Sequence, residues 1–388
     1  MPMYQPIVAS AYLGQVATRG KIPEQKYGPS TNQISSRIFH KATASLKGAQ
    51  LRYVNFYGTA GVGTGSAATV TASIEYPVGT TPQRVTFSAS NSAVIADAGD
   101  VWSDPLPFDV PAGAIFIEHN KFANTTGFAR QLTQSTVDKA QIGASTTDNT
   151  GTGSQTGMVA SGSVYGFTEV RGQTDQHSLL FLGDSTFAGS GDNNGYQTNA
   201  IGACERAATA LGLAFVNFGV SGAPSWNWKT NSNTYTGPPP ASITDVMNRV
   251  SAIILCSSIN DINGGSSAAA FKSDLEGVIA LWNPGGRKPF YLTTVPPLTT
   301  STDSWATAAN QTIPDAPKEA VRVAHNLAVR RNQIVGMTGV VDFAACVEDP
   351  ANPGKWLPFT TVDGTHPSTY GYNLCLPAFP ALGGKVYL

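Results

Sequence analysis

The stretch that decides the fold reads Leu179-Leu180-Phe181-Leu182-Gly183-Asp184-Ser185-Thr186. Its first four residues are apolar without interruption, which is typical of a strand buried on both faces of a parallel sheet. The chain then turns at once to a serine, which would lie at the carboxyl end of that strand and ahead of a helix. There its hydroxyl can face a cleft, and nearby backbone N–H groups can hold an oxyanion. A simple strand-end turn with an N-cap serine has the same local sequence, so the rest of the chain must decide.

Further apolar runs and amphipathic helices alternate after this stretch. Four runs resemble buried strands, at 213–216, 253–256, 290–293 and 340–343. Three apolar helical faces lie between them: Ile201, Cys204, Ala208 and Leu211; Phe271, Leu275, Val278, Ile279 and Trp282; and Val321, Ala324 and Ala328. For residues 176–388 this alternation predicts a three-layer α/β/α sandwich with a five-stranded parallel sheet. Active sites of such sheets gather at the carboxyl ends of the strands.

The first part of the chain has a different pattern. Residues 1–142 contain short runs rich in β-branched and aromatic residues, such as 51–56, 70–76 and 84–87, with Gly, Pro, Asn and Asp between them. This pattern predicts an all-β accessory domain, a sandwich or jelly roll. Residues 143–175 are rich in Gly, Ser and Thr, and we interpret them as a flexible linker before the second domain.

A second chemical motif, Val362-Asp363-Gly364-Thr365-His366-Pro367, lies near the other end of the chain. An acid three residues before a histidine lets one short loop supply both a base and the group that orients it. Asp363 can hold Nδ1–H of His366 while Nε2 faces a serine hydroxyl. A turn in which Asp363 only caps the next helix would leave His366 unexplained.

Two middle segments offer hydrogen-bond donors after the second and third predicted strands. A glycine at position 222 permits a backbone N–H to approach a substrate closely. Asn260, in Ser258-Ile259-Asn260-Asp261, can contribute a side-chain N–H. Together with the Ser185 N–H these would form an oxyanion hole. Each segment taken alone also fits an ordinary turn.

The order Gly-Asp-Ser, Gly, Asn-Asp and Asp-x-x-His, each block after a successive strand, resembles the SGNH (GDSL-type) hydrolases. The resemblance covers about residues 176–388 and implies a flavodoxin-like fold and a serine esterase that needs no metal or organic cofactor. It implies that Ser185, Asp363 and His366 form a catalytic triad, with Ser185, Gly222 and Asn260 as the oxyanion hole. The family usually has glycine where this chain has Ser258, which puts the substrate range in question.

The substrate is less readable from the sequence. Trp226, Trp228 and Trp356 lie in predicted loops at the active end of the sheet, and with Ser258 they are candidates for substrate contact. Tryptophans among polar residues can stack on sugar rings, but they can equally hold a loop in place by packing. Relatives of this family with an attached β-sandwich often deacetylate polysaccharides, so the resemblance favours O-acetyl esters on carbohydrate. The alternatives are a short-chain lipase or thioesterase, and a non-catalytic glycan-binding or phage tail protein on a hydrolase fold.

The composition and net charge of the chain limit the classes of partner that it can be expected to bind. The net charge is -1 and charged residues are only 13% of the chain, so nothing indicates a nucleic-acid partner. No apolar run reaches the length of a membrane span, and no secretion signal is visible at the start. The polar composition favours an extracellular or phage-particle location without excluding the cytoplasm.

The four cysteines are interpreted as buried free thiols, although a pairing of Cys346 with Cys375 stays open. The oligomeric state cannot be read from the sequence.

Overall fold

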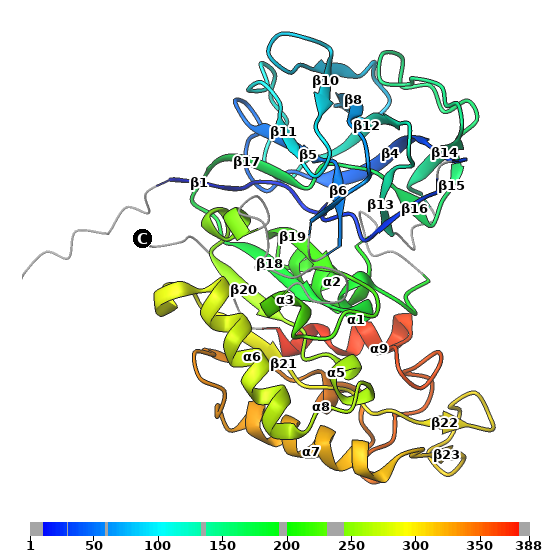
Figure 1. Cartoon of the computed structure of the whole chain (residues 1–388), viewed down its shortest axis with the longest axis vertical. Coiled ribbons are helices and arrows are strands. Elements are labelled where there is room, and N and C mark those ends of the chain that lie inside the picture. Colours follow the sequence, from blue (N-terminus) through cyan, green and yellow to red (C-terminus); the bar gives the residue numbers. More distant parts are fainter. Residues whose placement is uncertain are drawn as a thin grey trace, which may run out of the picture.

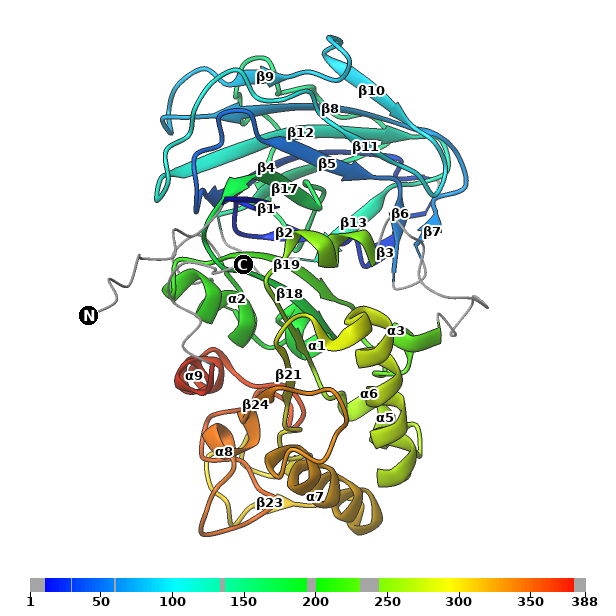
Figure 2. The same cartoon turned by 90° about the vertical axis from the view of Figure 1, so that its left-hand side faces the viewer.

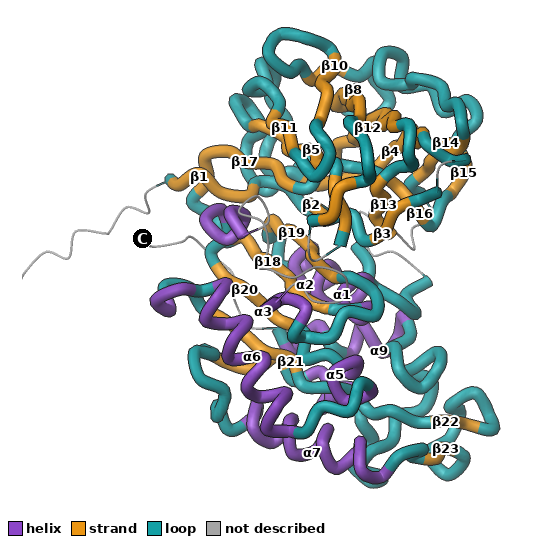
Figure 3. The backbone as a smooth tube through the Cα atoms, in the orientation of Figure 1, coloured by secondary structure: helices purple, strands orange, loops and turns teal. Residues whose placement is uncertain are grey.

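The computed structural model describes residues 11–28, 30–58, 61–132, 137–193, 200–230 and 244–379. The molecule has a β-rich part, drawn at the top of Figure 1, and an α/β part below it. Figure 3 shows the same division, because the helices lie almost entirely in the lower part.

Two antiparallel sheets form the N-terminal part. The larger has seven strands, in the order β10-β8-β12-β4-β14-β15 with β9 paired to β8, and the smaller has the order β1-β17-β5-β11. Their bounds are β4 (Gln33–Lys41), β8 (Ala68–Glu75), β9 (Gln83–Val85), β10 (Ser92–Ile95), β12 (Ile115–Asn124), β14 (Lys139–Gly143), β15 (Val159–Ala160), and β1 (Tyr12–Gln15), β5 (Gln50–Val54), β11 (Asp100–Trp102), β17 (Glu169–Thr174). Side chains from both sheets, among them Ile34, Val70, Phe116, Leu51 and Val170, meet in one apolar core, as the predicted sandwich requires.

Short strands complete this part of the chain. They are β3 (Gln25–Lys26), β13 (Ala129–Leu132) and β16 (Ser163–Val164), which form a three-stranded sheet, and the pair β6 (Phe56–Tyr57) and β7 (Val62–Gly63).

Residues 143–175 are not the flexible linker that the composition suggested. The segment contains β15, β16 and β17, and β17 lies inside the smaller sheet between β1 and β5. Its aromatic residues Tyr165 and Phe167 are fully buried in the N-terminal core. The polar residues before them are bonded to the larger sheet, for example by Lys121 Nζ, which donates to the Thr146 carbonyl at 2.8 Å. Hydrogen bonds therefore order a stretch with few apolar residues.

The C-terminal part is built on a parallel sheet with the order β2-β19-β18-β20-β21-β24. The strands are β2 (Gly20–Lys21), β18 (Ser178–Gly183), β19 (Ala214–Gly219), β20 (Ala252–Leu255), β21 (Phe290–Thr293) and β24 (Gly339–Val341). Five of them are the predicted strands. Numbered along the chain from β18, these five have the flavodoxin-like order 2-1-3-4-5. The sixth, β2, lies in the chain between β1 and β4 of the sandwich and pairs with β19, so the predicted boundary between two consecutive domains is too simple.

Helices cover both faces of this sheet (Figure 2). One face packs on α3 (Asn227–Thr230), α5 (Ile259–Asn263), α6 (Ala268–Trp282) and α7 (Ala316–Arg330). The other packs on α2 (Gly202–Ala210), α8 (Phe343–Val347) and α9 (Thr369–Leu374). The remaining elements are α1 (Ser185–Ala188), the strand pair β22 (Thr300–Ser301) and β23 (Gln311–Thr312), and the 3-10 turns η1 (Asp245–Arg249), η2 (Pro284–Gly286) and η3 (Leu376–Ala378). No helix in the described ranges is long and apolar enough to cross a membrane.

Helix α7 buries a face shifted from the predicted one: Val321 and Ala328 pack half-buried against the core, but Ala324 does not. Ala324 is exposed, and the buried residues of the helix are Arg322, His325, Asn326 and Val329. Arg322 can be buried because it forms ion pairs with Glu319 and Glu348. All four cysteines are free thiols, so Cys346 and Cys375 are not bridged in this structure.

Candidate active site

The serine of the Gly-Asp-Ser motif lies where β18 ends and α1 begins. Asp184 caps α1, because its Oδ1 accepts the Thr186 N–H at 2.8 Å. Gly183 leaves no room for a side chain: a Cβ there would lie 2.8 Å from Cys256 Cβ. Ser185 is thus held at the carboxyl end of the strand, and its residue surface is 8% exposed.

The second motif forms a tight loop. The Thr361 hydroxyl donates to the His366 carbonyl at 2.7 Å and accepts the Gly364 N–H at 2.9 Å. Gly364 has a φ of +79°, and a Cβ there would lie 1.8 Å from the Thr299 carbonyl oxygen. Only glycine meets both demands, and the turn brings Asp363 and His366 together at the tip of the loop.

The structure brings Ser185, His366 and Asp363 into one hydrogen-bonded row, although Ser185 and His366 are far apart in the chain. His366 Nε2 lies 2.7 Å from Ser185 Oγ, and His366 Nδ1 lies 2.7 Å from Asp363 Oδ2. Asp363 Oδ1 accepts the backbone N–H groups of His366 at 2.7 Å and of Thr365 at 2.9 Å. Such a row can transfer the serine proton to the imidazole while the carboxylate fixes the ring.

Electrostatics suit that transfer. Burial alone would raise the pKa of Asp363, but the His366 ring and the loop N–H groups outweigh it and hold this pKa at about 2. Burial likewise disfavours the charged imidazole, yet the hydrogen bond and charge of Asp363 raise the pKa of His366 above its usual 6.5. The carboxylate therefore stays ionised beside a strengthened base.

The two predicted oxyanion donors lie on neighbouring loops. Gly222 follows β19, is exposed, and has a φ of +81° with open space where a Cβ would stand. Asn260 is half-buried at the start of α5, and its Nδ2 lies 3.5 Å from the carboxylate of Asp184, the neighbour of Ser185. Asp261, the next residue, joins the two loops by accepting the Ser225 N–H at 2.6 Å, and burial raises its pKa to about 7.

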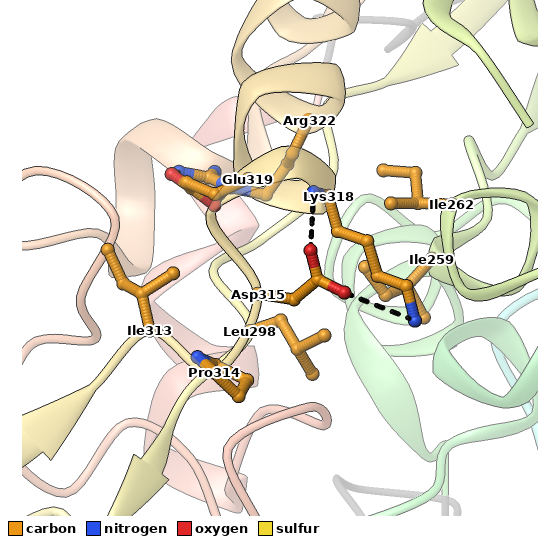
Figure 4. A pocket seen from close by; sticks show the side chains of 9 residues that line it. All are labelled: Ile259, Ile262, Leu298, Ile313, Pro314, Asp315, Lys318, Glu319 and Arg322. Carbon is orange, nitrogen blue, oxygen red and sulfur yellow. Dashed lines mark hydrogen bonds and ion pairs between the residues drawn. The ribbon is translucent and has the colours of Figure 1, made fainter. Parts of the chain in front are cut away.

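A small apolar recess lies between α5 and α7 (Figure 4), lined by Ile259, Ile262, Leu298, Ile313, Pro314, Asp315, Lys318, Glu319 and Arg322. Ile259 and Ile262 of α5 line this recess, whereas Asn260 bonds toward Asp184. Helix α5 is therefore anchored by its isoleucines and presents its amide on another side.

A model of the GDSL-like lipase/acylhydrolase family matches residues 181–374, half of the chain. The chain belongs to this family of ester hydrolases. No curated protein matches the sequence. Among solved structures, similar chains include a putative platelet activating factor from Streptococcus pneumonia (18% identity, TM-score 0.36, 52% of this chain and 82% of that one). A carbohydrate acetylesterase from Sinorhizobium meliloti is also similar, with 12% identity and a TM-score of 0.35 over 52% of this chain and 96% of that one.

The structure corrects the predicted substrate contacts of this GDSL-like protein. Trp228 and Trp356 are fully buried: Trp228 packs against Trp282, and Trp356 Nε1 donates to the Gly364 carbonyl at 3.1 Å. Ser258 is also buried and caps α5. Trp356 and Ser258 therefore support the loops of the site, Trp228 belongs to the core, and burial keeps all three side chains from a substrate. Trp226 is half-buried, and the Pro-rich stretch after it lies outside the described residues.

Some residues that lie near the predicted site, in space or only in sequence, had no signal in the sequence motifs. Glu24, from the segment between β2 and β3, accepts hydrogen bonds from the N–H and hydroxyl of Ser221, beside Gly222. Phe359 and Tyr370, on either side of the Asp363–His366 loop in sequence, are 63% and 56% exposed. Phe359 could have been noticed from its position near the motif, whereas only the three-dimensional structure brings Glu24 to the oxyanion loop.

Proposed function

We propose that this protein is a serine esterase that cleaves carboxylic esters through an acyl-enzyme, and that its substrates are O-acetyl esters on carbohydrate. The observation that carries the esterase proposal is the row of hydrogen bonds from Ser185 Oγ through the His366 ring to Asp363. No metal or organic cofactor has a part in this reaction.

The proposed reaction has two halves. His366 Nε2 takes the proton of Ser185 as Oγ attacks the ester carbonyl, and the N–H groups of Ser185, Gly222 and Asn260 stabilise the oxyanion. His366 then protonates the leaving alcohol, which departs and leaves the acyl group on Oγ. Water, deprotonated by His366, releases the acid and restores the serine. Asp363 stabilises the imidazolium in both halves.

One feature supports a carbohydrate substrate. Phe359 and Tyr370 expose aromatic rings close in sequence to the base loop, and a sugar ring can pack its C–H face on such a ring. Residues with hydroxyl groups, such as Thr365 and Ser368, lie between these two aromatic residues in the sequence, so this segment offers both apolar and polar groups.

The test measures acetate release from p-nitrophenyl acetate and from an acetylated polysaccharide, by wild type and by Ser185→Ala. We expect wild type to cleave both and the variant to lose both activities. Faster cleavage of longer p-nitrophenyl esters, with no acetate from the glycan, would replace the acetylesterase by a lipase or thioesterase. A wild type that neither cleaves esters nor reacts with a fluorophosphonate would favour the non-catalytic glycan-binding or structural alternative.

A further inference from the structure

The hydroxyl of Ser258 is the centre of a buried network between the nucleophile turn and the two oxyanion loops. Ser258 Oγ lies 2.7 Å from Asp184 Oδ2 and 3.1 Å from the Ala223 carbonyl oxygen. It also accepts from Asn260, at 3.0 Å from the backbone N and 3.0 Å from Nδ2. One oxygen therefore touches the residue before Ser185, the loop of Gly222 and the amide of Asn260.

The hydrogens in this network can be counted. A serine hydroxyl has one proton to donate and two lone pairs to accept with. The proton goes to Asp184 Oδ2, the shorter of its two contacts and the charged one, and the lone pairs take the two N–H groups of Asn260. One hydrogen of the Asn260 amide is thereby used. The other has only long contacts, to the Ala223 carbonyl at 3.4 Å and to Asp184 Oδ2 at 3.5 Å, and an oxyanion would be its stronger acceptor.

Without the hydroxyl, the amide of Asn260 would have a competing partner. Its Nδ2 already lies 3.5 Å from Asp184 Oδ2, close enough to turn toward a carboxylate that had lost the Ser258 proton. A buried carboxylate attracts an amide N–H strongly, because an unpaired charge is costly away from water. The hydroxyl thus both holds the amide and occupies the acceptor that would draw it away.

We propose that Ser258 is a positioning residue, whose hydroxyl aims Asn260 Nδ2–H at the oxyanion; this role rests on the proposed esterase function. It is a feature of this chain, since the family resemblance would place glycine at position 258. The serine does not narrow the cleft, because its side chain is buried and points into the network instead of the solvent. Ser258 touches no reacting atom and acts through Asn260.

The experiment compares four purified full-length variants with wild type. Ser258→Ala and Ser258→Gly remove the hydroxyl, Ser258→Thr keeps it, and Ser257→Ala is the matched control. Ser257 directly precedes Ser258 and is also buried, but its hydroxyl has no hydrogen-bond partner among the described residues. The measurements are kcat and KM for p-nitrophenyl acetate, the rate of fluorophosphonate labelling, and the melting temperature.

We expect Ser258→Ala and Ser258→Gly to lower kcat by about 10- to 100-fold, part of the loss that removal of a whole oxyanion donor causes, with KM within about threefold of wild type. Ser258→Thr should recover most of kcat, and Ser257→Ala should equal wild type. A mere helix cap would lower the melting temperature of Ser258→Ala but leave kcat unchanged at temperatures well below melting, and that result would overturn the proposal. Inactive wild type and Ser257→Ala would instead mean that the esterase function itself is wrong.

Discussion

His325 gives the protein a predictable sensitivity to acid. Its ring lies on the buried face of α7, stacked on Phe271 with centroids 4.1 Å apart, and neither ring nitrogen has a hydrogen-bond partner among the described residues. Burial without a partner disfavours the imidazolium and lowers the pKa of His325 from its usual 6.5 to about 3. The folded protein therefore keeps this histidine neutral in moderate acid.

The sign of the effect follows from the two pKa values. In the unfolded chain the histidine takes up a proton as the pH falls through about 6.5, whereas in the folded chain it does so only near 3. Between these values the unfolded state binds more protons, so the free energy of unfolding falls as the pH falls. The slope approaches about 1.4 kcal/mol per pH unit below the unfolded pKa, and the loss between pH 7 and pH 4.5 is roughly 2.5 kcal/mol.

The variant His325→Phe keeps an aromatic ring against Phe271 and removes the titrating group. Urea unfolding of both proteins at pH 7 and at pH 4.5 gives the loss of stability for each, and the difference between the losses isolates His325 from the carboxylates. We expect wild type to lose roughly 2.5 kcal/mol more than the variant. The half-exposed His177, replaced by glutamine, serves as the control and should change this difference much less. Parallel losses in wild type and His325→Phe would refute the reasoning.

Three further predictions concern the site. Asp363→Asn should lower kcat by about 10³- to 10⁴-fold and move the acid limb of the pH–rate profile below its wild-type position, because Asp363 raises the pKa of His366; an unmoved limb would contradict that coupling. Gly364→Ala should abolish activity and lower the melting temperature, since its Cβ has no space; a fully active variant would show that the loop is looser than described. Trp228→Ala should cost about 3–5 kcal/mol in urea unfolding, and Trp226→Ala clearly less; equal losses would argue against the burial of Trp228.

The sequence predicted the elements whose signal is local. Five strands of the parallel sheet were readable because a strand covered on both faces is apolar throughout, as Leu179–Leu182 is. Ser185 was readable because its turn directly follows β18, and His366 because the Asp-x-x-His spacing is itself local, although its loop comes after α8 and not directly after a strand. Their meeting at 2.7 Å agrees with the rule that loops at the carboxyl ends of parallel strands lie together.

Predictions failed where partners come from distant parts of the chain. Arg322 on the buried face of α7 is neutralised by Glu348, which no helical periodicity can indicate. Trp228 lies among polar residues in the sequence, yet its neighbour in space is Trp282. Likewise Phe167, at the end of a polar low-complexity stretch, finds its apolar surroundings in the N-terminal sheets. Local composition describes only a residue's neighbours in the sequence, whereas its burial depends on its neighbours in space.

Strand β2 has a consequence for how the protein can be made and cut. Gly20 pairs with Val216, so the edge strand of the catalytic sheet is synthesised long before the strand that receives it. The two parts are interleaved along the chain, because β2 lies between the sandwich strands β1 and β4. Expression of residues 176–388 alone would therefore expose one side of β19, the strand that leads to Gly222. An unpaired edge of this kind invites pairing with a second copy of the chain. A stand-alone hydrolase fragment would therefore need a substitute for Gly20 and Lys21, two residues that lie more than 150 positions before it in the chain.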